Sequence, residues 1–309
     1  LGIVNNLLFG SECGDVDKLT ALSKILVNED TQLKSLIKEH LAKGDTFAKA
    51  REKSLIQYLK DEEINKIITS SNNILGIEYI KSILRLNSTI TPSTLKREGS
   101  NYNDKNLSNS FSSATAIREL LKNKNSLENL KNLIPKESYE IFSKLQDENY
   151  PLVFDEDMFK FIKYKIQTNC INFNNLYEIT EGLENKLIKE ITSSNSYEDF
   201  ILKVKSKRYT YSKISRILTH IYLGLDSNTF LNIDNPNNLY ARVLGFNNRG
   251  REVLSLIKRN SSIPLITKVP RFTNNPLLQF DIQATAAYAN LNNKINPNKD
   301  YLQSPIIKY

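Results

Sequence analysis

Residues 71–121 constrain the fold most, because they combine a polar turn, a helix, a strand, a basic turn, a long polar loop and a second helix. Apolar residues recur at close to helical spacing from Ile74 to Leu84, after short polar side chains suited to an N-terminal cap. Pro92 fits the start or the edge of a short strand over residues 94–97, which Gly99 ends. This order predicts part of a mixed α/β domain.

The basic turn and the second helix suggest an anion site. The strand ends in Lys96 and Arg97, either Ser112 or Ser113 can cap the next helix, and Arg118 lies in its first turns. The first N–H groups of a helix are unpaired, so they can bind a phosphate together with nearby cations. On spacing alone, a capped amphipathic helix with no ligand remains the commoner interpretation.

The N-terminal residues predict a second strand that ends in a turn. Residues 3–9 are mostly apolar, Gly10 follows them, and Asp15 or Asp17 can cap a helix after the turn. A strand, a glycine turn and a helix form the ligand-facing edge of an open α/β sheet, where the backbone can approach a nucleotide at Gly10.

Composition limits the class of protein. The 309 residues are 40% hydrophobic and 25% charged, as in ordinary globular proteins, and no apolar run approaches membrane-spanning length. Cys13 and Cys170 lack metal-ligand spacing, and His40 and His220 are isolated, so we expect reduced thiols, a cytoplasmic protein and no metal site. A net charge of +8 favours a polyanionic partner, with a solvated basic surface as the alternative.

Beyond residue 124 the pattern becomes almost entirely helical. We therefore expect two domains, with a mixed α/β domain over residues 1–124 and a mainly helical domain over residues 125–309. A short strand is expected over residues 264–268. The expected helices of this half are 126–133, 136–145, 156–167, 175–191, 197–205, 211–225 and 249–258.

One segment of the helical half carries concentrated positive charge. Its cations alternate with aromatic rings, so that phosphate contacts and base stacking can share one surface. A solvated helix end with tyrosines packed inward is an equally good interpretation. The cations are Lys207, Arg208, Lys213 and Arg216, and the rings are Tyr209 and Tyr211.

The motifs together resemble one known family. Ser113-Ala114-Thr115-Ala116-Ile117-Arg118 is similar to the S-[SA]-T-x-[IV]-R signature of the nucleotidyltransferase superfamily. The chain as a whole resembles the bacterial tRNA(Met) cytidine acetate ligases, and this resemblance covers essentially all of it. The other motifs that carry the resemblance begin at Phe9, Ser71, Lys96, Lys207 and Arg242.

The resemblance implies a Rossmann-like ATP-binding domain followed by a tRNA-binding helical domain. It also implies ATP-dependent activation of acetate and acetylation of N4 of the wobble cytidine in elongator tRNA(Met), without a membrane or a stable protein partner. Mg²⁺ is compatible with such chemistry, but the sequence does not specify it. The residues expected to bind ATP are Gly10, Asn72 or Asn73, Arg97, Ser113, Thr115 and Arg118, and those expected to bind tRNA are Lys207, Arg208, Lys213 and Arg216.

The chain departs from the family pattern in two places. It lacks the H-x-G-H motif that the superfamily carries on its first strand and loop, so we expect the first half of the nucleotide-binding domain to precede this sequence and the chain alone to be inactive. Tyr102-Asn103-Asp104 also stands where Tyr-His-Asp is expected. Another ATP-dependent nucleotidyl- or adenylyltransferase and a non-catalytic RNA-binding module are the alternative functions.

Overall fold

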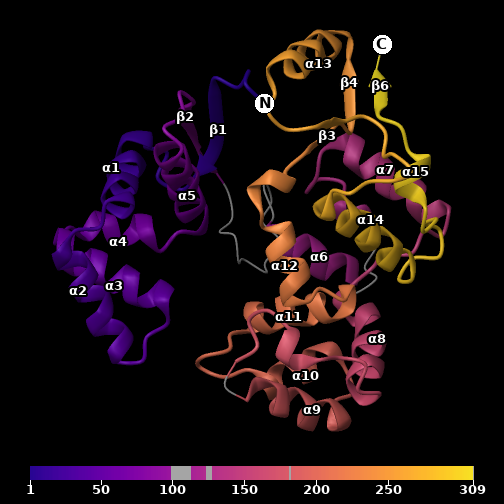
Figure 1. Cartoon of the computed structure of the whole chain (residues 1–309), viewed down its shortest axis with the longest axis horizontal. Coiled ribbons are helices and arrows are strands. Elements are labelled where there is room, and N and C mark those ends of the chain that lie inside the picture. Colours follow the sequence, from indigo (N-terminus) through magenta and orange to yellow (C-terminus); the bar gives the residue numbers. More distant parts are fainter. Residues whose placement is uncertain (99–112, 123–126, 181, 309) are drawn as a thin grey trace. The chain divides into compact units, whose positions relative to one another are not determined.

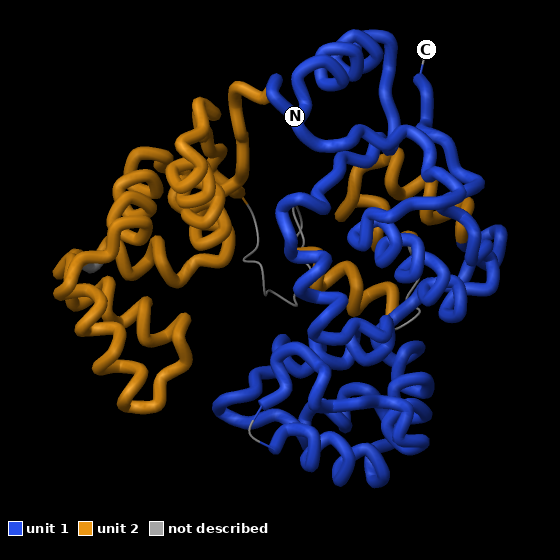
Figure 2. The backbone as a smooth tube through the Cα atoms, in the orientation of Figure 1, with its two compact units in different colours: residues 1–3, 146–309 blue, residues 4–145 orange. Residues whose placement is uncertain are grey.

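The chain divides into two compact units (Figure 2). Val4–Leu145 form one, here called the α/β unit, and Leu1–Ile3 with Gln146–Tyr309 form the other, here called the helical unit. The domain boundary expected near residue 124 lies outside the described residues and stays a prediction. The computed structural model describes residues 1–98, 113–122, 127–180 and 182–308.

The helical unit has a core built from amphipathic helices. Fully buried side chains such as Phe200, Ile162 and Ile214 come from three different helices of this core. The helices are α8 (Asp155–Gln167), α9 (Leu183–Ser193), α10 (Tyr197–Val204), α11 (Tyr211–Leu223), α12 (Ser227–Ile233), α13 (Asn248–Asn260), α14 (Pro276–Ala289) and α15 (Lys299–Leu302) (Figure 1).

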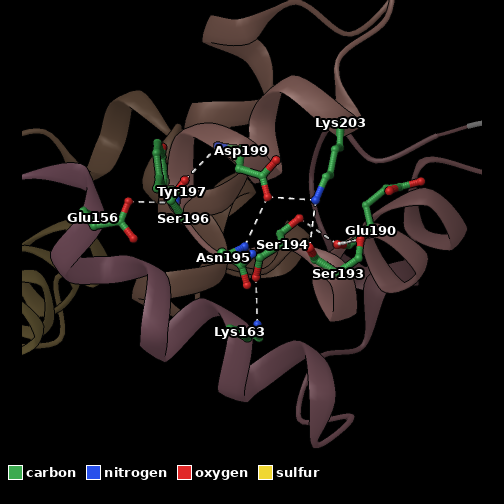
Figure 3. Close-up of polar contacts among 10 residues, drawn as sticks. All are labelled: Glu156, Lys163, Glu190, Ser193, Ser194, Asn195, Ser196, Tyr197, Asp199 and Lys203. Atoms are coloured by element: carbon green, nitrogen blue, oxygen red, sulfur yellow. Dashed lines mark hydrogen bonds and ion pairs between the residues drawn. The ribbon is translucent and has the colours of Figure 1, made fainter.

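Polar contacts around the α9–α10 connection hold α8, α9 and α10 together (Figure 3). Lys163 of α8 donates a hydrogen bond of 2.8 Å to the backbone carbonyl of Ser194. Glu156, also on α8, accepts one of 2.8 Å from the backbone N–H of Tyr197, at the start of α10. Because the first N–H groups of a helix have no partner within it, this carboxylate completes the α10 N-terminus that Ser196 caps.

The expected helix over residues 175–191 is wrong in its first half. A 3₁₀ turn covers Phe173–Asn175, and α9 begins only at Leu183. Gly182 precedes it with φ +79°, a left-handed conformation that breaks the helical path. Helices α12 and α14 were not expected, and a 3₁₀ segment, Leu127–Leu130, replaces the helix expected over residues 126–133.

Short parallel pairs form between strands that precede α13 in the sequence and strands that follow it. Strand β3 (Ala241–Arg242) pairs with β5 (Leu265–Ile266), which falls within the strand expected over residues 264–268. Strand β4 (Gly245–Asn247) pairs with β6 (Ile306–Lys308), near the C-terminus of the chain (Figure 1).

The α/β unit contains a parallel pair of strands. Strand β1 (Asn6–Ser11) pairs with β2 (Thr91–Lys96), and both run in the same direction so that Gly10 lies opposite Leu95 (Figure 1). The predicted strands are confirmed with shifted ends. Pro92 has no N–H to donate to a neighbouring strand. It is tolerated because β2 is an edge strand of this pair.

Helices make up most of the rest of what is described of the α/β unit, and the last of them, α7, runs two residues past its end at Leu145. Asp15 caps the first of them by accepting hydrogen bonds from the backbone N–H groups of Asp17 and Lys18, which selects Asp15 from the two predicted caps. The helices are α1 (Val16–Val27), α2 (Thr31–Ala42), α3 (Phe47–Leu59), α4 (Glu62–Ile68), α5 (Ser71–Arg85), α6 (Ala114–Lys122) and α7 (Lys136–Asp147).

Gly76 lets α5 pack closely against β1. A Cβ atom at this position would lie 2.4 Å from the ring of Phe9, closer than real contacts allow. A glycine inside a helix is usually unfavourable by about 0.5–1 kcal/mol relative to alanine. Its presence here is explained by packing, since Ile77 and Ile80 of the same helix are buried in the core of this unit.

The N-terminus of α5 is held by a residue that lies 60 positions earlier in the sequence. The Glu12 carboxylate accepts hydrogen bonds from the backbone N–H groups of Asn72 (3.2 Å) and Asn73 (2.9 Å) and from the Asn72 side chain (2.7 Å). Burial raises the pKa of Glu12, but these hydrogen bonds outweigh it, so the pKa lies below its ordinary value of 4.5.

We predict that Glu12→Gln lowers the free energy of unfolding by about 1–2 kcal/mol at neutral pH, because a neutral amide makes weaker bonds to the helix N-terminus. A lowered pKa stabilises the fold above the ordinary pKa, and this contribution disappears as the pH falls through the folded-state value. The difference between wild type and variant should therefore shrink below pH 4.5. Urea unfolding across this range measures it.

Glu63→Gln is the matched control. Glu63 forms an exposed ion pair with Lys18 at 2.6 Å, so its loss should change the unfolding free energy by less than about 1 kcal/mol. Equal stability of wild type and Glu12→Gln at every pH would show that the carboxylate does not hold α5.

Candidate functional site

The carboxyl end of the two strands brings together Gly10 and Arg97, two of the predicted site residues. The Arg97 backbone N–H donates to the Ser11 carbonyl at 2.8 Å, which extends the strand pairing by one residue. A Cβ atom at Gly10 would lie 3.2 Å from Arg97 Cγ. Glycine therefore lets the aliphatic part of the Arg97 side chain lie close to the β1 backbone. Arg97 is nevertheless exposed to solvent.

The turn after β1 has a conformation that needs glycine. Gly14 has φ +66°, and a Cβ atom there would lie 2.6 Å from Lys96 Cβ. The buried Ser11 hydroxyl accepts a hydrogen bond from the Gly14 N–H at 3.1 Å and lies 2.7 Å from the Thr94 hydroxyl of β2. The turn is thus fixed against the end of β2, where the cations of Lys96 and Arg97 follow.

The start of α5 joins the same edge through Glu12 and Asn73. The Asn73 side chain is only 1% exposed, and its oxygen accepts a hydrogen bond of 3.1 Å from the Cys13 backbone N–H. Asn72 is more exposed and points its amide at Glu12. Of the two predicted alternatives, Asn73 fixes the turn, and Asn72 remains the candidate for a ligand contact.

A cavity of about 480 Å³ opens beside this turn. Lys66 and Lys96 contribute cations to its lining, and Glu12 and Asp15 contribute carboxylates. Lys18 also lines the cavity, but its ammonium group donates a hydrogen bond to Glu63, which raises the pKa of Lys18. Lys66 and Lys96 line the cavity, and the exposed Arg97 follows Lys96 at the same edge of the strands, so cations there can meet a phosphate-bearing ligand.

Three further predicted residues lie on or just before α6. The Ser113 hydroxyl accepts a hydrogen bond of 3.1 Å from the Ala116 N–H, which confirms Ser113 as the helix cap, and Ser112 lies outside the described residues. Thr115 is half-buried, and Arg118 is exposed. Residues 99–112, including Tyr102-Asn103-Asp104, lie outside the described residues, so the share of α6 in the site stays a prediction.

The predicted RNA surface of the helical unit is partly occupied by its own contacts. Arg216 binds Glu178 through two hydrogen bonds of 2.7 Å, and the Lys213 ammonium lies 4.7 Å from the centroid of the Tyr209 ring. Tyr209 is buried, with its hydroxyl bonded to Thr180. The stacking role expected for Tyr209 is therefore wrong, because the ring packs inward.

The remaining residues of that surface lie in the connection between α10 and α11 and at the first position of α11. Lys207 and Arg208 are exposed in this connection, and Thr210 caps α11. Tyr211 is partly exposed, and its hydroxyl donates a hydrogen bond of 2.6 Å to Glu198. Lys207 and Arg208 are thus accessible from solvent.

Sequence analysis missed two acidic residues with specific roles. Glu12 gave no local signal, since its partners Asn72 and Asn73 are about 60 residues away. Asp300 forms an ion pair of 2.5 Å with Arg242, although 58 residues separate them. Only knowledge of which segments lie side by side reveals either pair.

Two classes of feature are absent from the described residues. No three His, Cys, Asp or Glu side chains in that part of the chain gather closely enough to bind a metal ion. None of the helices described there is both long and apolar enough to cross a lipid bilayer.

Comparisons with known proteins agree with the geometry. A family model described as HIGH Nucleotidyl Transferase matches residues 1–303. The tRNA(Met) cytidine acetate ligase of Clostridium novyi (strain NT) is 44% identical over 99% of this chain, which covers 76% of that protein. The protein of the same name from Clostridium tetani (strain Massachusetts / E88) is 40% identical over 100% of this chain and 77% of its own length.

Solved structures confirm the nucleotidyltransferase-family fold. The apo crystal structure of Thermotoga maritima TmcAL superposes with a TM-score of 0.89 at 30% identity, covering 99% of this chain and 77% of that one. The structure of the same protein bound with alpha-thio ATP gives a TM-score of 0.85 at 29% identity, with the same coverage. This chain therefore belongs to the HIGH nucleotidyltransferase family and, within it, to the tRNA(Met) cytidine acetate ligases.

Proposed function

We propose that the protein uses ATP to activate acetate and transfers the acetyl group to N4 of the wobble cytidine of elongator tRNA(Met). The observation that carries the proposal is the edge where Arg97 lies beside Gly10, next to the turn tied to α5. The names of the relatives and the alpha-thio ATP bound to the structural neighbour support the same ligand and substrates.

The first step joins acetate to the α-phosphate. An acetate oxygen attacks the α-phosphorus of ATP, the bond to pyrophosphate breaks, and acetyl-adenylate forms. No general base is required, because acetate is already ionised at pH 7. Negative charge grows on the departing pyrophosphate, so fixed cations stabilise the transition state. We assign this role to Arg97, with Lys96 beside it, and assign Gly10 and Asn72 to contacts with the nucleotide.

The second step transfers the acetyl group to RNA. The N4 amine attacks the acyl carbon, the carbon–oxygen bond to AMP breaks, and the amine loses one proton. The step requires an RNA surface as well as the nucleotide site. We assign RNA contacts to Lys207 and Arg208, which are exposed.

The proposal does not depend on a metal ion held by the protein itself. Magnesium typically binds through phosphate oxygens with only one or two carboxylates. Any Mg²⁺ therefore enters with ATP, and none of the steps above relies on it. We also propose action in the cytoplasm, where tRNA is available, without a membrane or a stable protein partner.

We predict that Arg97→Ala weakens ATP binding or acetyl-adenylate formation roughly tenfold or more, since a lost charge-assisted hydrogen bond costs about 1.5–3 kcal/mol. Acetate-dependent exchange between ATP and pyrophosphate, measured on the whole protein, reports this step without RNA. Arg85→Ala is the matched control, because Arg85 is an exposed cation at the far end of α5, about 20 Å along the helix from Asn72. Normal exchange by a folded Arg97→Ala protein would remove Arg97 from the site.

We predict a separate effect of replacing Lys207 and Arg208 together by glutamine. Phosphate contacts release counterions, so the double variant should bind tRNA(Met) more weakly and with a salt dependence reduced by up to about two contacts. Acetate-dependent pyrophosphate exchange should stay unchanged, because it needs no RNA. Binding titrations at several salt concentrations, together with the exchange assay, separate the two effects.

The control for that experiment replaces Lys160 and Lys189, which are exposed on α8 and α9, by glutamine. The charge change is the same, so a general electrostatic effect would appear in both double variants. Equal tRNA affinity and equal salt dependence in the two proteins would show that Lys207 and Arg208 only face solvent.

A further inference from the structure

The positive charge of the chain is concentrated in its last residues. Residues 241–309 contain ten Lys or Arg and three Asp or Glu, a net charge of +7 out of +8 for the whole chain. Four of these cations, Arg249, Arg251, Lys258 and Arg259, are exposed on α13. A polyanion is therefore attracted to this segment more strongly than to any comparable length of the preceding sequence.

A small cavity lies within the same segment. It encloses about 190 Å³ between the β3–β4 connection, the residues after β5 and the α15–β6 connection. Its lining combines polar and apolar surface, and the polar share is the larger. Among the lining residues are Val243, Val269, Arg242, Thr267, Asp300 and Ser304.

Asp300 is the least exposed polar residue of this lining. It is 6% exposed, and its Oδ1 accepts a hydrogen bond or ion-pair contact of 2.5 Å from Arg242 Nη2. Its Oδ2 is buried and has no hydrogen-bond partner among the described residues. A buried acceptor without a donor is unfavourable, so a ligand that supplies an N–H group would be stabilised here.

The chemistry of the pair limits the ligand. Asp300 Oδ2 lacks a donor, and Arg242 has further N–H groups that can donate. The Arg242 charge disfavours a metal cation, and apolar walls such as Val243 and Val269 suit the faces of a flat ring. The basic surroundings favour a ring carried on a phosphate chain. An exocyclic amine beside an accepting ring nitrogen, the edge shared by cytosine and adenine, satisfies both residues.

We propose that the Asp300–Arg242 cavity reads one unpaired cytosine or adenine of the bound RNA, with Asp300 accepting from its exocyclic amine and Arg242 donating to its ring nitrogen. The proposal rests on the proposed function only in taking RNA as the partner. It adds a base-specific contact to the phosphate contacts of the basic surface, which carry no sequence information themselves.

Asp300→Asn tests the proposed base contact, because it replaces a hydrogen-bond acceptor in the cavity by a donor. Arg242 requires an acceptor, so the asparagine oxygen should occupy the Oδ1 position and its NH₂ group the Oδ2 position. The cavity then presents a donor where the wild type presents an acceptor. Its preference should be lost, because an amine-bearing base now sets its amine against the asparagine NH₂, while uracil or hypoxanthine accepts from that NH₂ but turns a ring N–H toward Arg242.

The probes are anticodon stem–loop RNAs of elongator tRNA(Met) in which single loop cytosines are replaced by uracil and single loop adenines by inosine. Fluorescence anisotropy with the whole protein measures their affinities. At one position the substitution should lower the affinity of the wild type about tenfold or more, whereas Asp300→Asn should bind the original and the substituted RNA with about equal affinity. A response to uracil identifies the base as cytosine, and a response to inosine identifies it as adenine.

Two further variants separate recognition from folding. Asp281→Asn makes the same charge change in the same unit. Asp281 accepts a hydrogen bond from the Tyr240 hydroxyl. This variant should shift the affinities of all RNAs alike. Ser304→Leu narrows the cavity from its exposed side and leaves the Asp300–Arg242 pair intact. It should reduce discrimination between the RNAs without changing the thermal unfolding midpoint.

Equal weakening of every RNA by Asp300→Asn, or no change at all, would overturn the base-reading proposal and leave a structural ion pair whose second oxygen binds water only. The proposed function would survive that result as long as the wild type still acetylates tRNA(Met). If the wild type binds none of the stem–loops and acetylates no tRNA, both proposals fail.

Discussion

The carboxylate of Glu12 on the N-terminus of α5 is the contact on which the arrangement of the candidate nucleotide site depends. It ties the turn after β1 to a helix that begins about 60 residues later, and Asn73 strengthens the connection by accepting from the Cys13 N–H. The contact also has an electrostatic consequence. Since a carboxylate already occupies this helix end, the proposed site takes its positive charge from side chains such as Lys96 and Arg97 at the end of β2.

The helical unit uses much of its charge internally, which separates residues that hold the fold from those that can bind RNA. Lys163 binds a backbone carbonyl of the α9–α10 connection, and Arg216 binds Glu178 (Figure 3 shows the first of these contacts). Lys207, Arg208 and four cations of α13 are exposed to solvent. Phosphate attraction by such residues and base recognition by Asp300 and Arg242 would then be distinct functions of one unit.

Sequence analysis predicted the features that depend on neighbouring residues. The cap at Ser113 and the pairing-competent strands near Gly10 and Arg97 have local signals in turn and capping residues. The inward position of Tyr209 has no local signal, because it depends on Thr180. Helix α14 escaped prediction because it is apolar around most of its circumference and lacks the amphipathic spacing that identifies a helix. The long-range pairs of Glu12 and Asp300 require the fold itself.

The most direct test of the central claim is hydrogen–deuterium exchange of the whole protein with and without saturating ATP. If the β1 turn, the start of α5 and the end of β2 form the nucleotide site, ATP should slow exchange in peptides covering residues 10–15, 70–76 and 95–98. Peptides from α11 should change little, because this helix belongs to the proposed RNA-binding unit. Protection elsewhere, with these three segments unchanged, would contradict the assignment of the site.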